Sequence, residues 1–241
     1  RAKKSGVDYL TGQRVVTIDD HEVVLRDGTR YAADILVGAG GHQDPLRRSK
    51  WTEESLNIPV KFVLMDGDFP NVVELHFGSM APGGYAWVIP KAGGANIGLG
   101  IQKRFAKRGG LNRYAEDFIG RYTGEITFHG AGSLPMSGTV SRFVKEHCVL
   151  VGDAAGMVLP SNGAGITIAM IGGRIAGQVI AEHLKTGTSL SEYEVRWRKQ
   201  MGRVMRNSKR SFSIGSLMFR SPDWMVNLGF NRLTKGFIWR G

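Results

Sequence analysis

The stretch that decides the fold covers residues 148–184 and begins Cys148-Val149-Leu150-Val151-Gly152-Asp153-Ala154-Ala155-Gly156. A short apolar run that ends at Gly-Asp is typical of a buried parallel strand, and such sheets bind ligands beyond the carboxyl ends of their strands. Asp153 is therefore expected to stand where a carboxylate accepts hydrogen bonds from a polyol or a ribose.

The loop after this strand supplies small residues next to the start of a predicted helix. Its candidate ligand-binding positions are Pro160, Gly163, Ala164, Gly165 and Ile166. Glycine lets the backbone approach a flat or anionic ligand closely. The helix is predicted to begin at about Ile166, and its unpaired N–H groups favour negative charge there. The apolar run to residue 184 is long enough to raise a transmembrane question, but its arginine and glycines argue for a packed helix.

The arrangement resembles the second flavin motif of the para-hydroxybenzoate-hydroxylase-like FAD enzymes and, within them, the geranylgeranyl reductase family. The residues that match are Gly152-Asp153-Ala154-Ala155-Gly156, Pro160, Gly163, Gly165 and the small-residue run 169–176. The resemblance implies FAD as the cofactor and Gly152, Asp153 and the loop residues named above as its contacts. The alternative is a strand, a turn and a core helix that bind nothing.

A second glycine-rich turn follows a predicted buried strand at residues 35–37 and reads Gly38-Ala39-Gly40-Gly41. The family carries Ala-Asp-Gly here, followed by a serine. In this chain Gly40 replaces the acidic residue and Asp44 replaces the serine. The resemblance implies that Gly40 and Gly41 approach the cofactor through their backbone.

Residues 51–101 have a β pattern, with strands expected at 60–65, 72–77, 84–90 and 95–101. In Tyr85-Ala86-Trp87-Val88-Ile89-Pro90-Lys91 the residues Tyr85, Trp87 and Ile89 share one face of a strand. This run resembles the Tyr-x-Trp-x-Phe-Pro-Lys motif of geranylgeranyl reductases, with Ile89 in place of Phe. The resemblance implies that Tyr85, Trp87, Ile89 and Pro90 shape an isoprenoid cavity. A core face that packs on a helix is the alternative.

Other elements complete an α/β (α+β) fold. An antiparallel ribbon is expected over residues 14–31, an amphipathic helix over 111–122 and a loop over 130–138. The resulting organisation is a partial FAD-binding Rossmann-like domain with an inserted antiparallel β-sheet substrate domain and a C-terminal helical region. The expected divisions are 1–48 and 142–184 for the FAD-binding domain, 49–141 for the substrate domain and 185–241 for a basic helical region.

The charge of the chain is concentrated at its C-terminal end. The net charge is +11, and residues 185–241 hold 12 Lys and Arg against 3 Asp and Glu. Basic residues mixed with Met, Phe and Trp predict an anionic membrane surface as a partner. No nucleic-acid-binding motif accompanies the charge, so no nucleic acid is expected. The single cysteine fits a reducing compartment, and the expected location is cytoplasmic with peripheral membrane attachment. A solvated helical cap is the alternative for the tail.

Several motifs are absent from the sequence. No G-x-G-x-x-G occurs, so the unit that holds the adenosine of FAD is expected to precede residue 1. No Ser-His-Asp set and no metal-spaced His/Cys cluster occurs, so neither a catalytic acid or base nor a metal site is assigned. The chemistry would be carried by the flavin, with the protein supplying orientation and a dry cavity.

Three functions compete at this level. The first, implied by the resemblance, is FAD-dependent reduction of C=C bonds in geranylgeranyl or other polyprenyl chains of archaeal-type membrane lipids. Its electron donor, of NAD(P)H or ferredoxin type, is left open. The second is an aromatic-ring monooxygenase of the same fold. The third is a cofactor-free paralogue that serves as a lipid-binding or interaction module.

Overall fold

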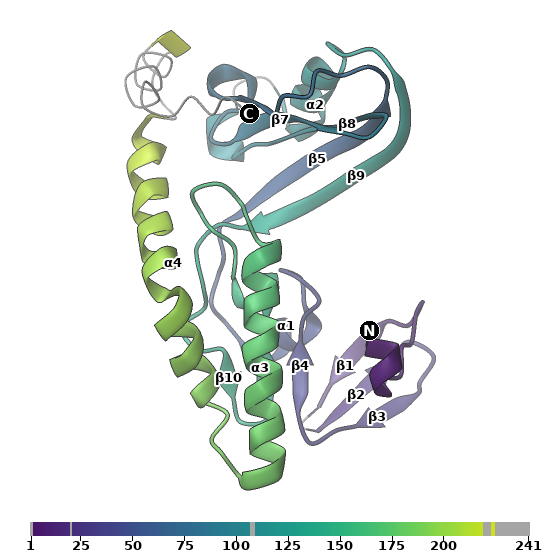
Figure 1. The fold of residues 1–241 in the computed structure, drawn as a ribbon, viewed down its shortest axis with the longest axis vertical. Coiled ribbons are helices and arrows are strands. Elements are labelled where there is room, and N and C mark those ends of the chain that lie inside the picture. The colour runs from purple at the N-terminus through teal and green to yellow at the C-terminus, as the bar shows by residue number, and fades with distance from the viewer. Residues whose placement is uncertain (1, 20, 107–108, 219–222, 225–241) are drawn as a thin grey trace. The chain divides into compact units, whose positions relative to one another are not determined.

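The computed structural model describes residues 2–19, 21–106, 109–218 and 223–224. The chain divides into two compact units (Figure 1). The first unit comprises Arg1–Glu54, Gly138–Val158 and Ala164–Arg203, and the second comprises Ser55–Ser137, Leu159–Gly163 and Val204–Gly241. The division into an FAD-binding domain (1–48 and 142–184), a substrate domain (49–141) and a basic helical region (185–241) stays a prediction.

The first unit is built around a three-stranded sheet of order β10-β11-β4. Strand β11 (Cys148–Leu150) runs parallel to β4 (Leu36–Gly38), with Val149 opposite Val37. Strand β10 (Val144–Lys145) pairs with β11 in the antiparallel sense. All three residues of β11 are buried, which confirms the buried parallel strand that the apolar run predicts. Helix α1 (Pro45–Lys50) packs against β4.

A separate antiparallel sheet of three strands forms the N-terminal part of the first unit. Its strands are β1 (Val15–Ile18), β2 (Glu22–Leu25) and β3 (Arg30–Ala32), and a short 3₁₀ turn, η1 (Ala2–Ser5), precedes them. The turn between β2 and β3 contains Gly28, which has φ +87°, and the side chain of Asp27 accepts a hydrogen bond from Thr29 N. The Asp-Gly signal therefore marks a true turn and the predicted ribbon is confirmed.

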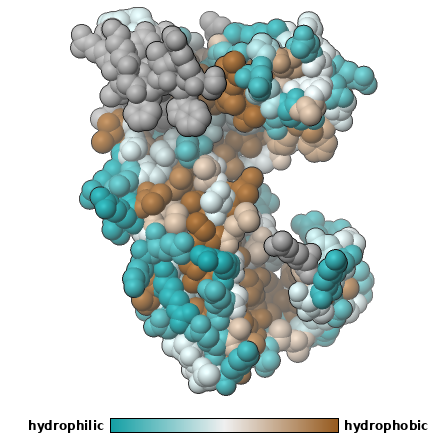
Figure 2. Space-filling view, viewed as in Figure 1, coloured by the Kyte–Doolittle hydropathy of each residue, from teal (hydrophilic) through white to brown (hydrophobic). Residues whose placement is uncertain are grey.

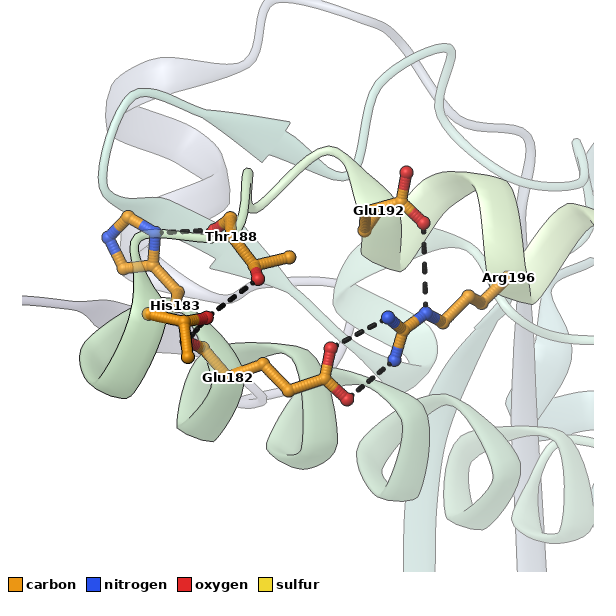
Figure 3. Close-up of polar contacts among 6 residues, drawn as sticks. Glu182, His183, Thr188, Glu192 and Arg196 are labelled. Carbon is orange, nitrogen blue, oxygen red and sulfur yellow. Dashed lines mark hydrogen bonds and ion pairs between the residues drawn. The ribbon is translucent and has the colours of Figure 1, made fainter.

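Two long helices complete the first unit and carry the chain into the second. Helix α3 (Ile166–Thr186) ends at Gly187, and α4 (Glu192–Met218) follows. Their facing surfaces are joined by a bidentate ion pair between Arg196 and Glu182, with N–O distances of 2.8 and 2.6 Å (Figure 3). No helix among the described residues is both long enough and apolar enough to cross a membrane.

Helix α4 presents a buried stripe at helical spacing, made by Tyr193, Trp197, Met201 and Met205. The ring of Phe143 meets Trp197 edge to face, with centroids 5.0 Å apart. The sequence pattern groups Met201 and Met205 with the basic residues of the tail, but the two methionines are buried, at 7% and 6% exposed, and are not available to a membrane surface. The aromatic residues of the tail at 219, 230, 237 and 239 lie outside the described residues.

The second unit contains a five-stranded antiparallel sheet of order β6-β7-β8-β5-β9. Its strands are β5 (Asn57–Asp66), β6 (Glu74–His76), β7 (Tyr85–Lys91), β8 (Gly94–Gly100) and β9 (Glu125–Pro135). Helix α2 (Leu111–Ile119) and the 3₁₀ turns η2 (Gly78–Met80) and η3 (Lys103–Phe105) connect them. One face of the sheet forms a buried core with α2, to which Val88, Ile97 and Phe118 contribute.

The loop expected over residues 130–138 is largely a strand, which corrects the sequence interpretation. Strand β9 pairs with β5 from Asp66 and Glu125 to Asn57 and Pro135, with one register shift. Glycine and proline lowered the strand signal there. The glycines are used for packing instead, because a Cβ at Gly130 would collide with the ring of Phe62.

Candidate functional site

The strand end at β11 leads directly into a tight 3₁₀ turn, η4 (Gly152–Ala155), which is closed by Gly156. Gly156 has φ +70°, and a Cβ there would meet the carbonyl oxygen of Gly138. Only glycine satisfies both requirements. Helix α3 packs on this turn, where a Cβ at Gly152 would lie 3.3 Å from the Cβ of Ala169. The backbone around Asp153 is thus held rigidly.

Asp153 is half-buried on this turn. Burial raises the pKa of its carboxyl, and the charge of His42 lowers it to a smaller extent. No hydrogen-bond donor within the described part of the chain contributes to this shift. A half-buried carboxylate that lacks donors costs free energy until a ligand supplies them. Hydroxyl or N–H groups of a bound molecule would do so.

The loop before α3 divides between the two units. Gly165, with Ala164 and Ile166, belongs to the first unit, where a Cβ at Gly165 would lie 3.3 Å from Asp153 Oδ1. Gly165 is the N-cap of α3 and provides no side-chain cap, so the first N–H groups of the helix have no side-chain partner at that position. The N-terminal part of α3 exposes apolar surface (Figure 2), with Ile166 and Met170 81% and 71% exposed.

The turn after β4 uses Asp44 differently from the family pattern. Asp44 is buried, accepts a hydrogen bond from Gly40 N at 2.7 Å and caps α1 by accepting one from Arg47 N at 3.0 Å. A Cβ at Gly40 would lie 2.9 Å from Asp44 Oδ2. Asp44 therefore closes its own loop. Gly41 has φ +81° and open space where a Cβ would be, so its backbone is accessible.

Sequence reasoning did not identify the role of Arg47. Its guanidinium is buried and donates to the carbonyl oxygens of Ala154 at 2.7 Å and Glu53 at 3.2 Å. Burial lowers the pKa of Arg47, and Glu53 and Asp44 oppose that effect. Arg47 thus joins α1 to the turn that carries Asp153. The sequence held no signal for this contact, because the two residues are 107 positions apart.

The second face of the large sheet has an unusual composition. Cross-strand neighbours alternate between large residues and glycine, so that Trp87, Gly98, Phe62 and Gly130 lie in one row. A Cβ at Gly98 would lie 2.5 Å from Phe62 Cβ and 2.6 Å from Trp87 Cζ2. The aromatic rings therefore lie over glycine backbone. Trp87 is further held by a 2.7 Å hydrogen bond from its Nε1 to Asn96 Oδ1.

Tyr85 and Trp87 are on this second face, whereas Ala86 and Val88 are on the buried core face. The motif residues thus do not serve as the core face of the sheet. Ile89 is 43% exposed. The one-face placement of Tyr85, Trp87 and Ile89 that the period of two predicts is confirmed by the register.

A cavity of about 1010 Å³ opens in the second unit. Tyr85 and Trp87 line it, together with Pro160 and Gly163 of the loop before α3. Ile89 and Pro90 are not among the residues around it. Apolar walls come from residues that include Ile58, Val60, Phe77, Tyr114, Phe118 and Leu134. A cavity of this size with aromatic and aliphatic walls suits a long apolar ligand.

The family model "Geranylgeranyl reductase catalytic domain" matches residues 56–131. Digeranylgeranylglycerophospholipid reductase 2 of Methanothermobacter thermautotrophicus is 35% identical over 233 residues, which cover 86% of this chain and 59% of that protein. The chain belongs to the geranylgeranyl reductase family. It spans less than two thirds of the length of this relative.

Solved structures agree with this family at the level of the fold. A geranylgeranyl bacteriochlorophyll reductase-like protein of Thermoplasma acidophilum matches with a TM-score of 0.77 and 23% identity, covering 93% of this chain and 62% of that one. HpxO of Klebsiella pneumoniae, solved with FAD and uric acid, matches with a TM-score of 0.62 and 19% identity, covering 93% and 62%. This chain of the geranylgeranyl reductase family therefore has the mixed α and β fold of these proteins.

Proposed function

We propose that this chain is part of an FAD-dependent reductase that adds hydrogen across the C=C bonds of geranylgeranyl chains in archaeal-type membrane lipids. The observation that carries the proposal is the cavity of the second unit, which lies in the region of the catalytic-domain match and is lined by Tyr85 and Trp87. Sequence relatives named digeranylgeranylglycerophospholipid reductase support the lipid class. The monooxygenase alternative has no comparable support from sequence relatives.

The cavity suits an isoprenoid chain for a physical reason. A polyprenyl chain offers no hydrogen-bonding groups, so its binding depends on buried apolar area and on shape. The glycines of β8 and β9 let the side chains of Trp87 and Phe62 pack closely against the backbone of the sheet. The ring of Trp87, which lines the cavity, is thereby held against the sheet, and Phe62 packs in the same cross-strand row.

The residues of the first unit fit FAD. Asp153 carries a half-buried carboxylate in need of donors, such as the hydroxyl groups of a ribityl chain. The uncapped start of α3, with Ala164, Gly165 and Ile166, suits the electron-rich edge of a flavin. Gly41 has open space beside its backbone, which allows a close approach of the cofactor. When bound, the reduced flavin would supply the hydride for the double bond, and the proton that completes the reduction would come from water or from another donor.

A membrane surface is proposed as the place where the lipid is delivered. Arg203, Arg206, Lys209 and Arg210 of α4 are all exposed. Each basic residue near an anionic bilayer contributes about 1 kcal/mol, an attraction that decays within a Debye length. The proposed attachment is therefore peripheral and sensitive to salt.

The test is reduction of a digeranylgeranyl phospholipid by the flavin-loaded protein with dithionite as electron source. Mass spectrometry should count hydrogen pairs added to the chains. Trp87→Ala should lose most of this activity while retaining flavin. Phe128→Ala is the matched control, because Phe128 is 51% exposed on the same sheet face and does not line the cavity. Hydroxylated product with oxygen consumption, in place of hydrogen addition, would favour a monooxygenase.

A further inference from the structure

The cavity of the second unit is not apolar throughout. Arg104 of η3 and Arg121, which follows α2, line it together with Asp117 and Asp223. Both arginines are exposed, so they stand where the cavity meets solvent. An isoprenoid chain carries no charged or hydrogen-bonding group, so its binding does not account for two cationic side chains at the cavity.

The two carboxylates of the cavity are already engaged. Asp117 forms an ion pair with Arg113, which is not a cavity residue, at 3.4 Å. Asp223 accepts hydrogen bonds from Ser79 N at 2.8 Å and from Ser79 Oγ at 2.6 Å. Each carboxylate therefore has partners of its own, and neither is paired with Arg104 or Arg121 among the described residues.

The arginines make only weaker contacts. Arg121 donates from Nε to the carbonyl oxygen of Asp117 at 3.2 Å and from Nη1 to Met80 Sδ at 3.6 Å. Arg104 donates from Nε to Gln102 Oε1 at 3.1 Å, and its guanidinium stands 4.7 Å over the ring of Phe105. Within residues 2–19, 21–106, 109–218 and 223–224, neither arginine forms an ion pair with a carboxylate. A guanidinium has five N–H donors, so each keeps donors for a ligand.

We infer that Arg104 and Arg121 bind the phosphate of the lipid head group, while the apolar walls of the same cavity take the isoprenoid chain. The inference rests on the proposed function and adds the group that recognises the head of the substrate. A guanidinium matches a phosphate with two parallel N–H···O bonds, which are stronger than bonds between neutral groups. The contacts of Arg104 with Phe105 and of Arg121 with Met80 hold the two side chains against the cavity wall.

The test compares two lipids with identical chains, digeranylgeranylglyceryl phosphate and the phosphate-free digeranylgeranylglycerol, in neutral-detergent micelles. Binding is followed by the change in tryptophan fluorescence, since Trp87 lines the cavity. This measurement needs neither flavin nor turnover. Arg104→Gln and Arg121→Gln should each weaken binding of the phosphate lipid by about tenfold, the value of one charge-assisted contact. Binding of the phosphate-free lipid should be unchanged.

Matched controls separate a phosphate site from general charge attraction. Lys103→Gln removes an exposed cation next to Arg104, and Lys91→Gln removes one at the end of β7, and neither residue lines the cavity. Both control variants should keep the wild-type preference for the phosphate lipid. Arg121→Lys, which keeps the charge and loses the planar fork, should fall between wild type and Arg121→Gln.

The outcomes separate this inference from the proposed function. If the wild-type protein binds both lipids equally, or if the double Gln variant keeps the preference, the head-group assignment is wrong and the isoprenoid cavity stands. The head-group assignment is also wrong if Lys103→Gln weakens binding of the phosphate lipid as much as Arg104→Gln does. If inorganic phosphate competes as strongly as the lipid, the site is a phosphate site unrelated to a lipid head group. If neither lipid binds the wild-type protein, the proposed function fails and this inference fails with it.

Discussion

The hydroxyl group of Tyr85 donates a 2.6 Å hydrogen bond to the carbonyl oxygen of Asn162. This bond joins β7 to the loop that precedes α3, and both residues belong to the second unit. Burial raises the pKa of Tyr85, so the phenol remains a donor at neutral pH. The motif tyrosine therefore holds in place the loop that brings Pro160 and Gly163 to the cavity.

Replacing Tyr85 by Phe should loosen this loop without emptying the cavity wall. Loss of one hydrogen bond is expected to cost about 1 kcal/mol, because Phe keeps the ring and removes only the donor. Hydrogen exchange of the loop amides at 159–163 should become faster. Tyr31→Phe, at a residue 43% exposed on the small sheet, is the control. Unchanged exchange in the Tyr85 variant would contradict the role given to this bond.

Adding a methyl group at Gly98 should destabilise the second unit. The new Cβ would lie 2.5 Å from Phe62 Cβ and 2.6 Å from Trp87 Cζ2, so the ring of Trp87 and the β5 backbone that carries Phe62 must shift. Overpacking of this kind costs about 1–3 kcal/mol. Gly132→Ala is a close match on the same face, since its nearest contact is Val60 Cγ2 at 3.6 Å. The Gly98→Ala variant should unfold at a lower urea concentration than the Gly132→Ala variant. Equal midpoints would show that Trp87 and Phe62 can move to accommodate the methyl group at little cost.

Asp153 should reduce the stability of the ligand-free protein at neutral pH. Its pKa is raised on folding, so the folded state binds more protons than the unfolded state and stability falls as pH rises through the folded pKa. Asp153→Asn should therefore be more stable than wild type at about pH 7, with the gain lost at about pH 3, below the unfolded pKa. Urea unfolding at the two pH values measures this. An equal gain in stability at the two pH values would contradict the raised pKa of Asp153 as its cause.

The same carboxylate should matter for the flavin. Asp153→Ala is expected to retain much less FAD than wild type in a protein that otherwise folds, because the donors of the cofactor lose their acceptor. Bound flavin is measured by absorbance after gel filtration. Asp34→Ala, an exposed carboxylate of the same unit, should retain wild-type flavin. Full flavin occupancy in the Asp153→Ala variant would show that Asp153 is not part of the FAD site.

The ion pair between Glu182 and Arg196 should contribute stability that is lost in acid. The hydrogen bonds from Arg196 lower the pKa of Glu182, so the contribution is present above the unfolded pKa and disappears as pH falls through the folded pKa. Arg196→Lys removes the bidentate geometry (Figure 3), and its melting temperature should approach that of wild type in acid. Arg174→Lys on the exposed side of α3 is the control. The effect should be small, because the pair is at the surface.

Reversing the charges of α4 should release the protein from anionic vesicles. The residues to change to Glu are Arg203, Arg206, Lys209 and Arg210. Wild-type cosedimentation should fall with added salt and with a lower anionic fraction. Reversal of Lys3 and Lys4 is the control for net charge. Vesicle binding that depends on neither the salt concentration nor the anionic lipid fraction would exclude electrostatic attachment.

The sequence by itself determined most of the secondary structure and the family. A short continuous apolar run that ends at Gly152 and Asp153 is typical of a strand buried on both faces, and β11 is one. The alternation in Tyr85-Ala86-Trp87-Val88 places the aromatic residues opposite the core, because successive side chains of a strand point to opposite faces. These are local rules, which need no knowledge of distant residues.

Only the tertiary structure decided what depends on residues far apart in the chain. The glycines of β9 suggested a loop until the register placed Gly130 beneath the ring of Phe62. No short stretch of sequence indicates that Arg47 donates to the carbonyl oxygen of Ala154, which is 107 positions away. The two cavity arginines, Arg104 and Arg121, carry no motif and meet the same cavity only in the folded unit. Strand register and side-chain burial create these neighbours, and neither is encoded in any short stretch of sequence.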